Sequence, residues 1–164
     1  MATSETPPKP ASESRLVLHT LMLPEHSNAL GNVHGGVILR QVDEAGAIAA
    51  MRHARKACVT IAIDSMTFRH PVHLGELLVC TAEVTWVGKT SIEVHVDVHS
   101  EHPITGEQSH TNSAYVVYVA LGNDGRPAPA TPLLLTTDAE RAAFEAGARR
   151  HAYRIANREP RHPA

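Results

Sequence analysis

Hydrophobic and polar residues follow two different periods along the chain. In residues 37–51, a long run of apolar and alanine residues, the polar side chains return to one face at about 100° per residue, which predicts an amphipathic helix. Residues 90–100 alternate strictly instead: valine and isoleucine face one way, and Glu93, His95, Asp97 and His99 the other. This pattern predicts a strand with one packed face and one solvated face.

Further strands are predicted from β-branched and apolar runs bounded by Pro, Gly and polar residues, at residues 15–23, 58–68, 77–87 and 109–121. The run at 58–68 is so apolar that we expect it to be buried on both faces or nearly so. A final helix, capped by Thr137 or Asp138 and ending near residue 154, is rich in Arg and Glu and should be largely solvated.

The order of these elements is a strand, a long helix, four consecutive strands and a trailing helix. Consecutive strands with short turns imply an antiparallel sheet, which must cover so apolar a helix, so the fold class is α+β. Residues 1–14 are rich in Pro, Ser and Glu and are expected to form a disordered tail. Residues 15–122 should form the folded domain, and residues 123–164 a Pro/Gly-rich loop and the C-terminal helix.

Composition narrows the classes of function. The chain has 164 residues, of which 43% are hydrophobic, enough for one domain with a sizeable core. A formal charge of −2 argues against nucleic acid as a partner, and no apolar stretch approaches the roughly 20 residues of a membrane span. Cys58 and Cys80 lie in strand-like runs and are expected to be free, buried thiols. We therefore expect a cytoplasmic protein that does not associate with membranes.

Candidate chemistry gathers at the start of the long helix. Gly35 and Gly36 stand where the first backbone N–H groups of a helix have no internal partner, so a ligand oxygen can approach them. Asp43, two turns further on, shares a stripe with small residues rather than the polar face. It is either a boundary residue of an amphipathic helix or a functional carboxylate. Together with the Asn28 amide, these groups could supply an oxyanion site, a base and an orienting group.

These residues resemble a known active-site segment. The pattern Asn28-Ala29-x-Gly31-x-x-His34-Gly35-Gly36, followed by Asp43, is similar to that of hotdog-fold acyl-CoA thioesterases. The resemblance is to the cytosolic, brain-type acyl-CoA hydrolases and their bacterial single-domain relatives. It continues through residues 88–94 and 100–106 and covers about residues 15–122.

The resemblance implies an antiparallel sheet wrapped around a long central helix, and a homodimer joined into one continuous sheet. Further assembly, such as a trimer of dimers, is also implied, with each active site shared between two protomers. Brain-type enzymes are tandem repeats that place the Asn and the Asp on different repeats. This chain carries both Asn28 and Asp43 on one repeat, so a homodimer would hold two complete sites.

The implied reaction is hydrolysis of fatty acyl-CoA to fatty acid and coenzyme A, with no cofactor, since coenzyme A belongs to the substrate. The thioester carbonyl would bind the N–H groups of Gly35 and Gly36. Asp43 would deprotonate a water molecule or attack the carbonyl to form a mixed anhydride, and Asn28 of the partner protomer would orient the reactants. His34 has either a catalytic role or a structural hydrogen bond that fixes the loop.

Cations and hydroxyl groups should line the path of coenzyme A, and an acyl tunnel would be aliphatic. The coenzyme A candidates are Arg69, Lys89, Thr90, Ser91 and the arginine pair at 149–150. The aliphatic candidates are Leu39, Ile61, Ile63 and Met66.

The sequence bears on four other kinds of site. A non-catalytic acyl-CoA-binding hotdog protein would need the glycine loop but not Asp43, and a hotdog enoyl-CoA hydratase or dehydratase would need a His working with an Asp. The twelve histidines offer a metal site at most on the strand that carries His95, Asp97 and His99, without a metal-ligand spacing motif. No GxSxG motif marks a nucleophilic serine.

Overall fold

Five strands form one antiparallel sheet in a computed structural model that describes residues 6–64 and 66–157. In spatial order they are β2 (Leu16–Leu21), β4 (Leu77–Val87), β5 (Ser91–Glu101), β6 (Gln108–Leu121) and β3 (Ala57–Ile63). Every neighbouring pair in this order is antiparallel. Because the order is open, β2 and β3 are the two edge strands, and among the described residues neither pairs on its outer side. None of the described helices is long and apolar enough to cross a membrane.

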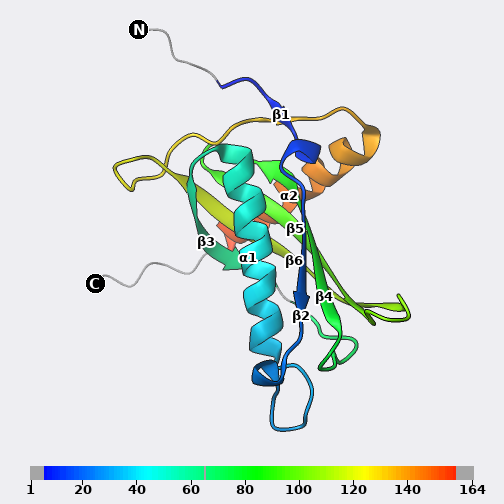
Figure 1. Ribbon diagram of the computed structural model, residues 1–164. Coiled ribbons are helices and arrows are strands. Elements are labelled where there is room, and N and C mark those ends of the chain that lie inside the picture. The colour runs from blue at the N-terminus through cyan, green and yellow to red at the C-terminus, as the bar shows by residue number, and fades with distance from the viewer. Residues whose placement is uncertain (1–5, 65, 158–164) are drawn as a thin grey trace, which may run out of the picture.

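The helix α1 (Gly35–Ala54) runs across one face of the sheet (Figure 1). Its buried residues include Val42, Ala45 and Ala49, each fully shielded from solvent. Ile92, Val94, Val96 and Val98 of β5 are equally buried in the same core. The small side chains of α1 let the helix lie close to the valine-rich sheet. The expected architecture, an antiparallel sheet curled around a long helix, is confirmed.

β3 differs from its prediction. It was expected to be buried on both faces or nearly so, but it is an edge strand in which Val59 and Ile61 are 44% and 56% exposed. The prediction is wrong because an apolar run indicates only that a strand will be covered, not that its own chain covers it. An apolar strand with a free edge is a surface on which another chain can add a strand.

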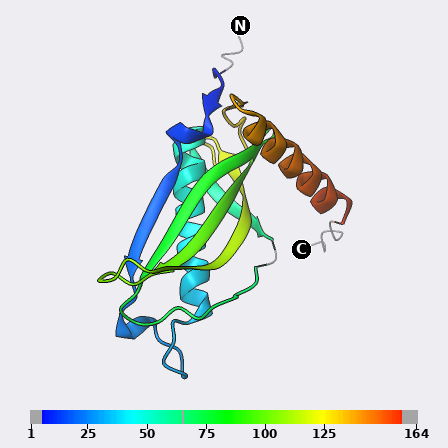
Figure 2. The same ribbon diagram turned by 90° about the vertical axis from the view of Figure 1, so that its right-hand side faces the viewer.

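The helix α2 (Asp138–Ala156) lies on the opposite side of the sheet from α1 (Figure 2). Its start is confirmed: Thr137 is the N-cap and forms a capping box with Glu140. α2 is largely solvated, as expected, with Gly147 the one buried residue among those described in the helix. The expected solvation of the outer face of β5 is wrong at Glu93, whose side chain is fully buried. Gly147 lets α2 approach Trp86 closely, because a Cβ there would overlap the Trp86 side chain. Arginines of α2 compensate the charge of Glu93.

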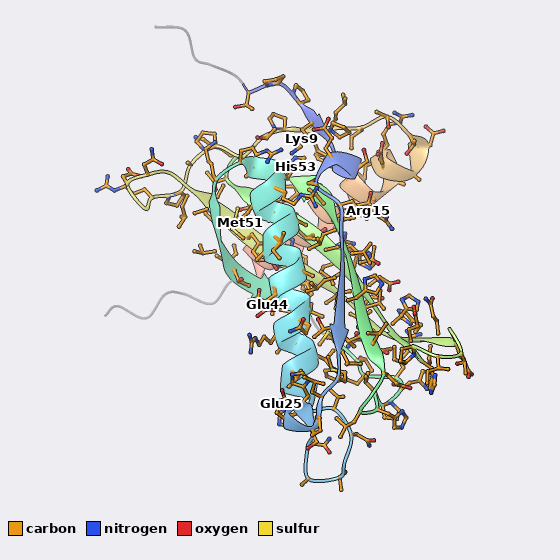
Figure 3. The ribbon with its side chains drawn as sticks, in the orientation of Figure 1. Lys9, Arg15, Glu25, Glu44, Met51 and His53 are labelled. Atoms are coloured by element: carbon orange, nitrogen blue, oxygen red, sulfur yellow. The ribbon has the colours of Figure 1, made fainter. Side chains whose placement is uncertain are left out.

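Part of the expected N-terminal tail is folded. β1 (Lys9–Pro10) pairs in parallel with β7 (Leu133–Leu134), and a short 3-10 helix, η1 (Ala11–Glu13), follows it. A second 3-10 helix, η2 (Pro24–His26), lies in the loop before α1. The Lys9 ammonium donates to the carbonyl of Arg52 (2.7 Å), and Lys9 and His53 lie together at the C-terminal end of α1 (Figure 3). The prediction of disorder is therefore wrong for residues 9–14, while residues 1–5 lie outside the described chain.

Both cysteines lie in strands, as expected, and both are free thiols. Burial raises the pKa of Cys58 to about 11 and that of Cys80 to about 12. Both thiols are therefore protonated at neutral pH, and neither is suited to act as a nucleophile.

Candidate active site

The Asp43 side chain points from α1 toward the sheet and is half-buried. Thr60 of β3 donates a hydrogen bond to Asp43 Oδ1 (2.7 Å). The Tyr118 hydroxyl on β6 lies 3.0 Å from the Asp43 carbonyl oxygen and 3.4 Å from Oδ1. Within the described chain, hydrogen bonds to this carboxylate go only to Oδ1. The second oxygen, Oδ2, has no hydrogen-bond partner among the described residues.

Tyr118 is a permanent donor to Asp43. Its side chain is fully buried, and burial raises the pKa of its hydroxyl, with the neighbouring Asp43 charge adding to the effect. The hydroxyl reaches α1 only because residue 46 is glycine: a Cβ there would overlap the Tyr118 oxygen. Thr60, Tyr118 and Gly46 were not among the residues predicted for the site. Gly46 was the one available signal, since a glycine inside a helix costs about 1 kcal/mol and so indicates a close approach.

The glycine pair is only partly free to bind an oxyanion. α1 begins at Gly35, and the ring of His34, the N-cap, accepts the N–H of Gly36 at Nδ1 (2.9 Å). The Gly36 donor is therefore occupied, contrary to the expectation that both glycines bind the carbonyl. The Gly35 N–H has no acceptor within the described chain. Of the two roles weighed for His34, this hydrogen bond is the structural one.

A cleft of about 520 Å³ opens beside the start of α1. It is lined by Gly35, Gly36, Leu39, Ile63, Asp64, Met66 and Phe68. Three of the four aliphatic residues expected to line an acyl path therefore share one cleft. Ile61 does not, since it lines a separate groove between the outer face of β3 and α2.

Asn28 is not brought to Asp43 within one chain. Its side-chain oxygen accepts hydrogen bonds from the backbone N–H groups of Leu30 (2.8 Å) and Asn32 (3.2 Å). These bonds hold the loop before α1, which extends beyond the N-terminal end of the helix (Figure 1). No hydrogen bond joins Asn28 to Asp43 within the described residues.

The coenzyme A candidates divide into two places. Thr90 and Ser91 line the groove beside α2, and the Thr90 carbonyl accepts the N–H of Ala120 (2.9 Å). The Arg69 N–H instead donates to the Thr111 carbonyl near the other end of β6 (3.1 Å). Nine residues of strand separate these two anchor points, or about 30 Å. Arg69 is therefore too distant to hold the same phosphate as the hairpin that contains Lys89.

A Ser, a His and an Asp do meet on the outer face of the sheet, but not as a catalytic triad. Ser113 donates to Asp97 Oδ1 (2.8 Å), and the Nε2 atom of His110 lies 2.9 Å from the same oxygen and 3.1 Å from the serine hydroxyl. A triad needs the Ser and the Asp on different nitrogens of the imidazole ring. Among the described residues, no group of three His, Cys, Asp or Glu side chains is placed to hold a metal ion.

A curled antiparallel sheet around one long helix, with a carboxylate on that helix held by the sheet, defines the class of hotdog-fold thioesterases. The family model described as Thioesterase superfamily matches residues 30–107. An uncharacterized acyl-CoA thioester hydrolase of Bacillus subtilis is 31% identical over 166 residues, which cover 96% of this chain and 95% of the relative. The chain belongs to the thioesterase superfamily and, within it, to the acyl-CoA thioester hydrolases.

Solved structures agree with this assignment. An apo hexameric acyl-CoA thioesterase is 35% identical, with a TM-score of 0.87 over 94% of this chain and 99% of that one. A Staphylococcus aureus acyl-CoA hydrolase in complex with butyryl coenzyme A and coenzyme A is 29% identical, with a TM-score of 0.84 over 93% of both chains. Three variants of that enzyme, in which an aspartate, an asparagine or a threonine is replaced by alanine, are similar to the same degree.

Proposed function

We propose that the protein hydrolyses fatty acyl-CoA to a free fatty acid and coenzyme A, with Asp43 as the acting carboxylate. The observation that carries the proposal is the geometry of Asp43: Thr60 donates to Oδ1, the Tyr118 hydroxyl donates to the Asp43 carbonyl and lies 3.4 Å from Oδ1, and Oδ2 is left without a partner in the described chain. A carboxylate fixed in this way is oriented without being neutralised. It can remove a proton from water or attack the thioester carbon.

Both routes end in the same products. If Asp43 is a base, the oxygen of water bonds to the carbonyl carbon, the C–S bond breaks and coenzyme A leaves as a thiolate. If Asp43 is a nucleophile, its own oxygen displaces the thiolate and water then hydrolyses the mixed anhydride. Neither route uses a cofactor. A structure of the S. aureus acyl-CoA hydrolase with an aspartate replaced by alanine is consistent with a functional carboxylate in that enzyme.

The start of α1 is the proposed site of the developing oxyanion. The Gly35 N–H is the donor with no acceptor in the described chain, and the positive end of the helix dipole favours negative charge there. Gly36 serves the same site indirectly. It lacks a Cβ, which would stand 3.0 Å from the His34 ring nitrogen, and so permits the cap that shapes the turn.

A second copy of the chain completes the proposed site. The free edge of β3 carries exposed Val59 and Ile61 beside Thr60, and pairing this edge would bury all three. We propose that Asn28 of the second copy orients the water molecule or the carbonyl at Asp43. A dimer is the minimum assembly, and the hexameric relative supports a larger one.

The hairpin that carries Lys89, Thr90 and Ser91 is the proposed site for the phosphates of coenzyme A, because it joins a cation to two hydroxyl groups at the mouth of a groove. Arg69 remains a candidate for another part of the coenzyme. The location that we propose for this activity is the cytoplasm, supported by the two free thiols.

The test is release of free thiol from short, medium and long acyl-CoAs by the purified protein. Asp43→Asn and Asn28→Ala should each lower the rate by about 10²- to 10⁴-fold. Oligomers that contain both variants should regain activity, since each mixed dimer holds one intact site. The control is Glu44→Gln, which alters the adjacent carboxylate, paired on the surface with Arg40 (2.8 Å).

Two results would count against the proposal. No thiol release from any acyl-CoA, together with tight acyl-CoA binding, would identify a non-catalytic binding protein. Mixed oligomers no more active than the separate variants would contradict a site shared between two copies.

A further inference from the structure

One wall of the cleft beside α1 is built by residues that follow β3. Pairing of β3 with β6 ends at Ile63, and the chain then leaves the sheet. Its backbone is tied at two points: the Asp64 N–H donates to the Tyr115 carbonyl (2.9 Å), and the Arg69 N–H to that of Thr111 (3.1 Å). Between these ties Met66 and Phe68 line the cleft. We call Asp64 and residues 66–69 the wall segment.

The wall segment has one polar side-chain anchor among its described residues. The Asp64 carboxylate pairs with the Arg154 guanidinium of α2 at 2.9 Å, and no other hydrogen bond or ion pair links a described side chain of the segment to the rest of the protein. The two side chains are 29% and 19% exposed, so water weakens this pair less than it would weaken one on the open surface.

Arg154 is itself fixed by a buried charge. Its second terminal nitrogen donates to Glu93 (2.9 Å), whose fully buried carboxylate also receives two hydrogen bonds from Arg150 (2.7 and 3.1 Å). Two arginines thus balance the carboxylates of Glu93 and Asp64. Because a planar guanidinium offers several donors in fixed directions, holding one nitrogen on Glu93 determines where the other points. Arg154 therefore presents a rigid attachment point to the wall segment.

We propose that Arg154 is a positioning residue that, through Asp64, holds the wall segment and so sets which acyl chains the cleft accepts. The inference rests on the proposed hydrolysis of acyl-CoA. In this way α2 would influence the active site although it lies on the opposite side of the sheet from α1. The ligand portion concerned is the apolar chain of the substrate, since Leu39, Met66 and Phe68 line the cleft.

The effect should fall on selectivity rather than on the chemical step. Thr60, the strand residue that holds Asp43, lies four residues before Asp64, or about 13 Å along an extended chain. Loosening the wall segment would move Met66 and Phe68 while the contacts of Asp43 with Thr60 and Tyr118 persist. The shortest acyl groups reach least far along the cleft and should be least affected.

The first experiment compares kcat and KM for acetyl-, hexanoyl- and palmitoyl-CoA. In Asp64→Ala the ratio of kcat/KM for the long and short substrates should change by about 10-fold, mainly through KM, since misfitted apolar groups are discriminated on this scale. Asp64→Glu, which keeps the charge, should lie closer to the wild type. The double variant with Arg154→Met should show no larger change than Asp64→Ala alone, because both substitutions break the same contact.

The control is Arg141→Met, which removes an ion pair with Asp138 in the first turn of the same helix (2.6 Å) and should leave the ratio unchanged. An equal fall in kcat/KM for every chain length in Asp64→Ala would overturn the proposal, as would additive effects of the two substitutions.

A second measurement does not depend on turnover. Hydrogen exchange of the free protein should be faster in residues 64–72 of Asp64→Ala than in the wild type, with exchange in α1 unchanged. Unchanged exchange in that segment would show that the ion pair does not hold it, and would overturn the inference. A wild-type protein that hydrolyses no acyl-CoA would instead overturn the proposed function, so the two failures are distinguishable.

Discussion

Asp43 and Glu93 are two carboxylates held in opposite ways on the two sides of one sheet. Asp43 is half-buried, and neutral hydroxyl groups contact only one of its oxygens. Glu93 is fully buried, and two guanidinium groups occupy both of its oxygens. The first arrangement leaves a charge and an oxygen available to a substrate, whereas the second uses both to fasten a helix to a strand. What distinguishes the two carboxylates is the charge of their partners.

The pKa of Glu93 follows from these contacts. Burial alone would raise the pKa of this carboxyl, but the hydrogen bonds from Arg150 and Arg154 outweigh burial and lower it. Burial alone would lower the pKa of the Arg150 guanidinium, but its hydrogen bonds to Glu93 and the charge of that carboxylate outweigh burial and raise it. Glu93 is therefore ionised wherever the protein is folded near neutral pH, and its role is structural.

Removing the charge of each carboxylate in turn should have its largest effect on stability. Glu93→Gln leaves Arg150 and Arg154 without their buried counter-charge and should lower the free energy of unfolding by about 3 kcal/mol, the lower end for a buried pair because both arginines are partly exposed. Asp43→Asn removes a charge that is paired with no cation in the part of the chain that the structure describes, and it should leave stability nearly unchanged. Urea unfolding of both variants measures the difference. Equal losses of stability in the two variants would show that Asp43 and Glu93 contribute equally to folding, contrary to the difference in their partners.

Sequence patterns predicted one side of this comparison and missed the other. The glycine pair, the small-residue stripe and Asp43 lie within one helix, so local spacing was enough to find them. The burial of Glu93 was not foreseen because strict alternation in β5 indicates two faces without showing what covers the second. The covering residues, Arg150 and Arg154, belong to a helix whose composition suggested solvent.

The partners of Asp43 were missed for a related reason. Thr60 and Tyr118 are 17 and 75 residues away in sequence, and their meeting depends on how β3 and β6 are registered against α1. Most strand boundaries were predictable, as with residues 77–87, which match β4 in full, but the strand predicted at 58–68 ends at Ile63. Register across the sheet was not, because the hydrophobic period fixes which face a residue occupies but not its neighbour on another strand.

A smaller effect, on kcat, is expected from removing the hydroxyl groups that donate to Asp43. Thr60→Val and Tyr118→Phe each remove a neutral hydrogen bond that orients Asp43 and should lower kcat by about 10-fold, the equivalent of one such bond. The matched control is Thr85→Val, since Thr85 donates to Glu93 (3.0 Å) as Thr60 does to Asp43. That variant should lose some stability but keep its kcat. A comparable loss of kcat in Thr85→Val would mean that stability, not orientation, underlies the effect.

The smallest effect is a change in how stability depends on pH. Because the folded state lowers the pKa of Glu93 below the ordinary value of 4.5, its contribution to stability is complete above that value and is lost as the pH falls through the folded pKa. Glu93→Gln cannot lose this contribution, so the part of the stability gap between wild type and variant that comes from this carboxyl should be constant from pH 7 to 5 and narrow below pH 4.5. Urea unfolding at a series of pH values measures the gap. Subtracting the variant removes the titration of Asp97, whose pKa Glu93 does not shift. The pKa values of His95 and His151 respond to the Glu93 charge and therefore differ between the two proteins. A gap that does not narrow in acid would show that the two arginines hold residue 93 by shape and hydrogen bonding, with no contribution from its charge.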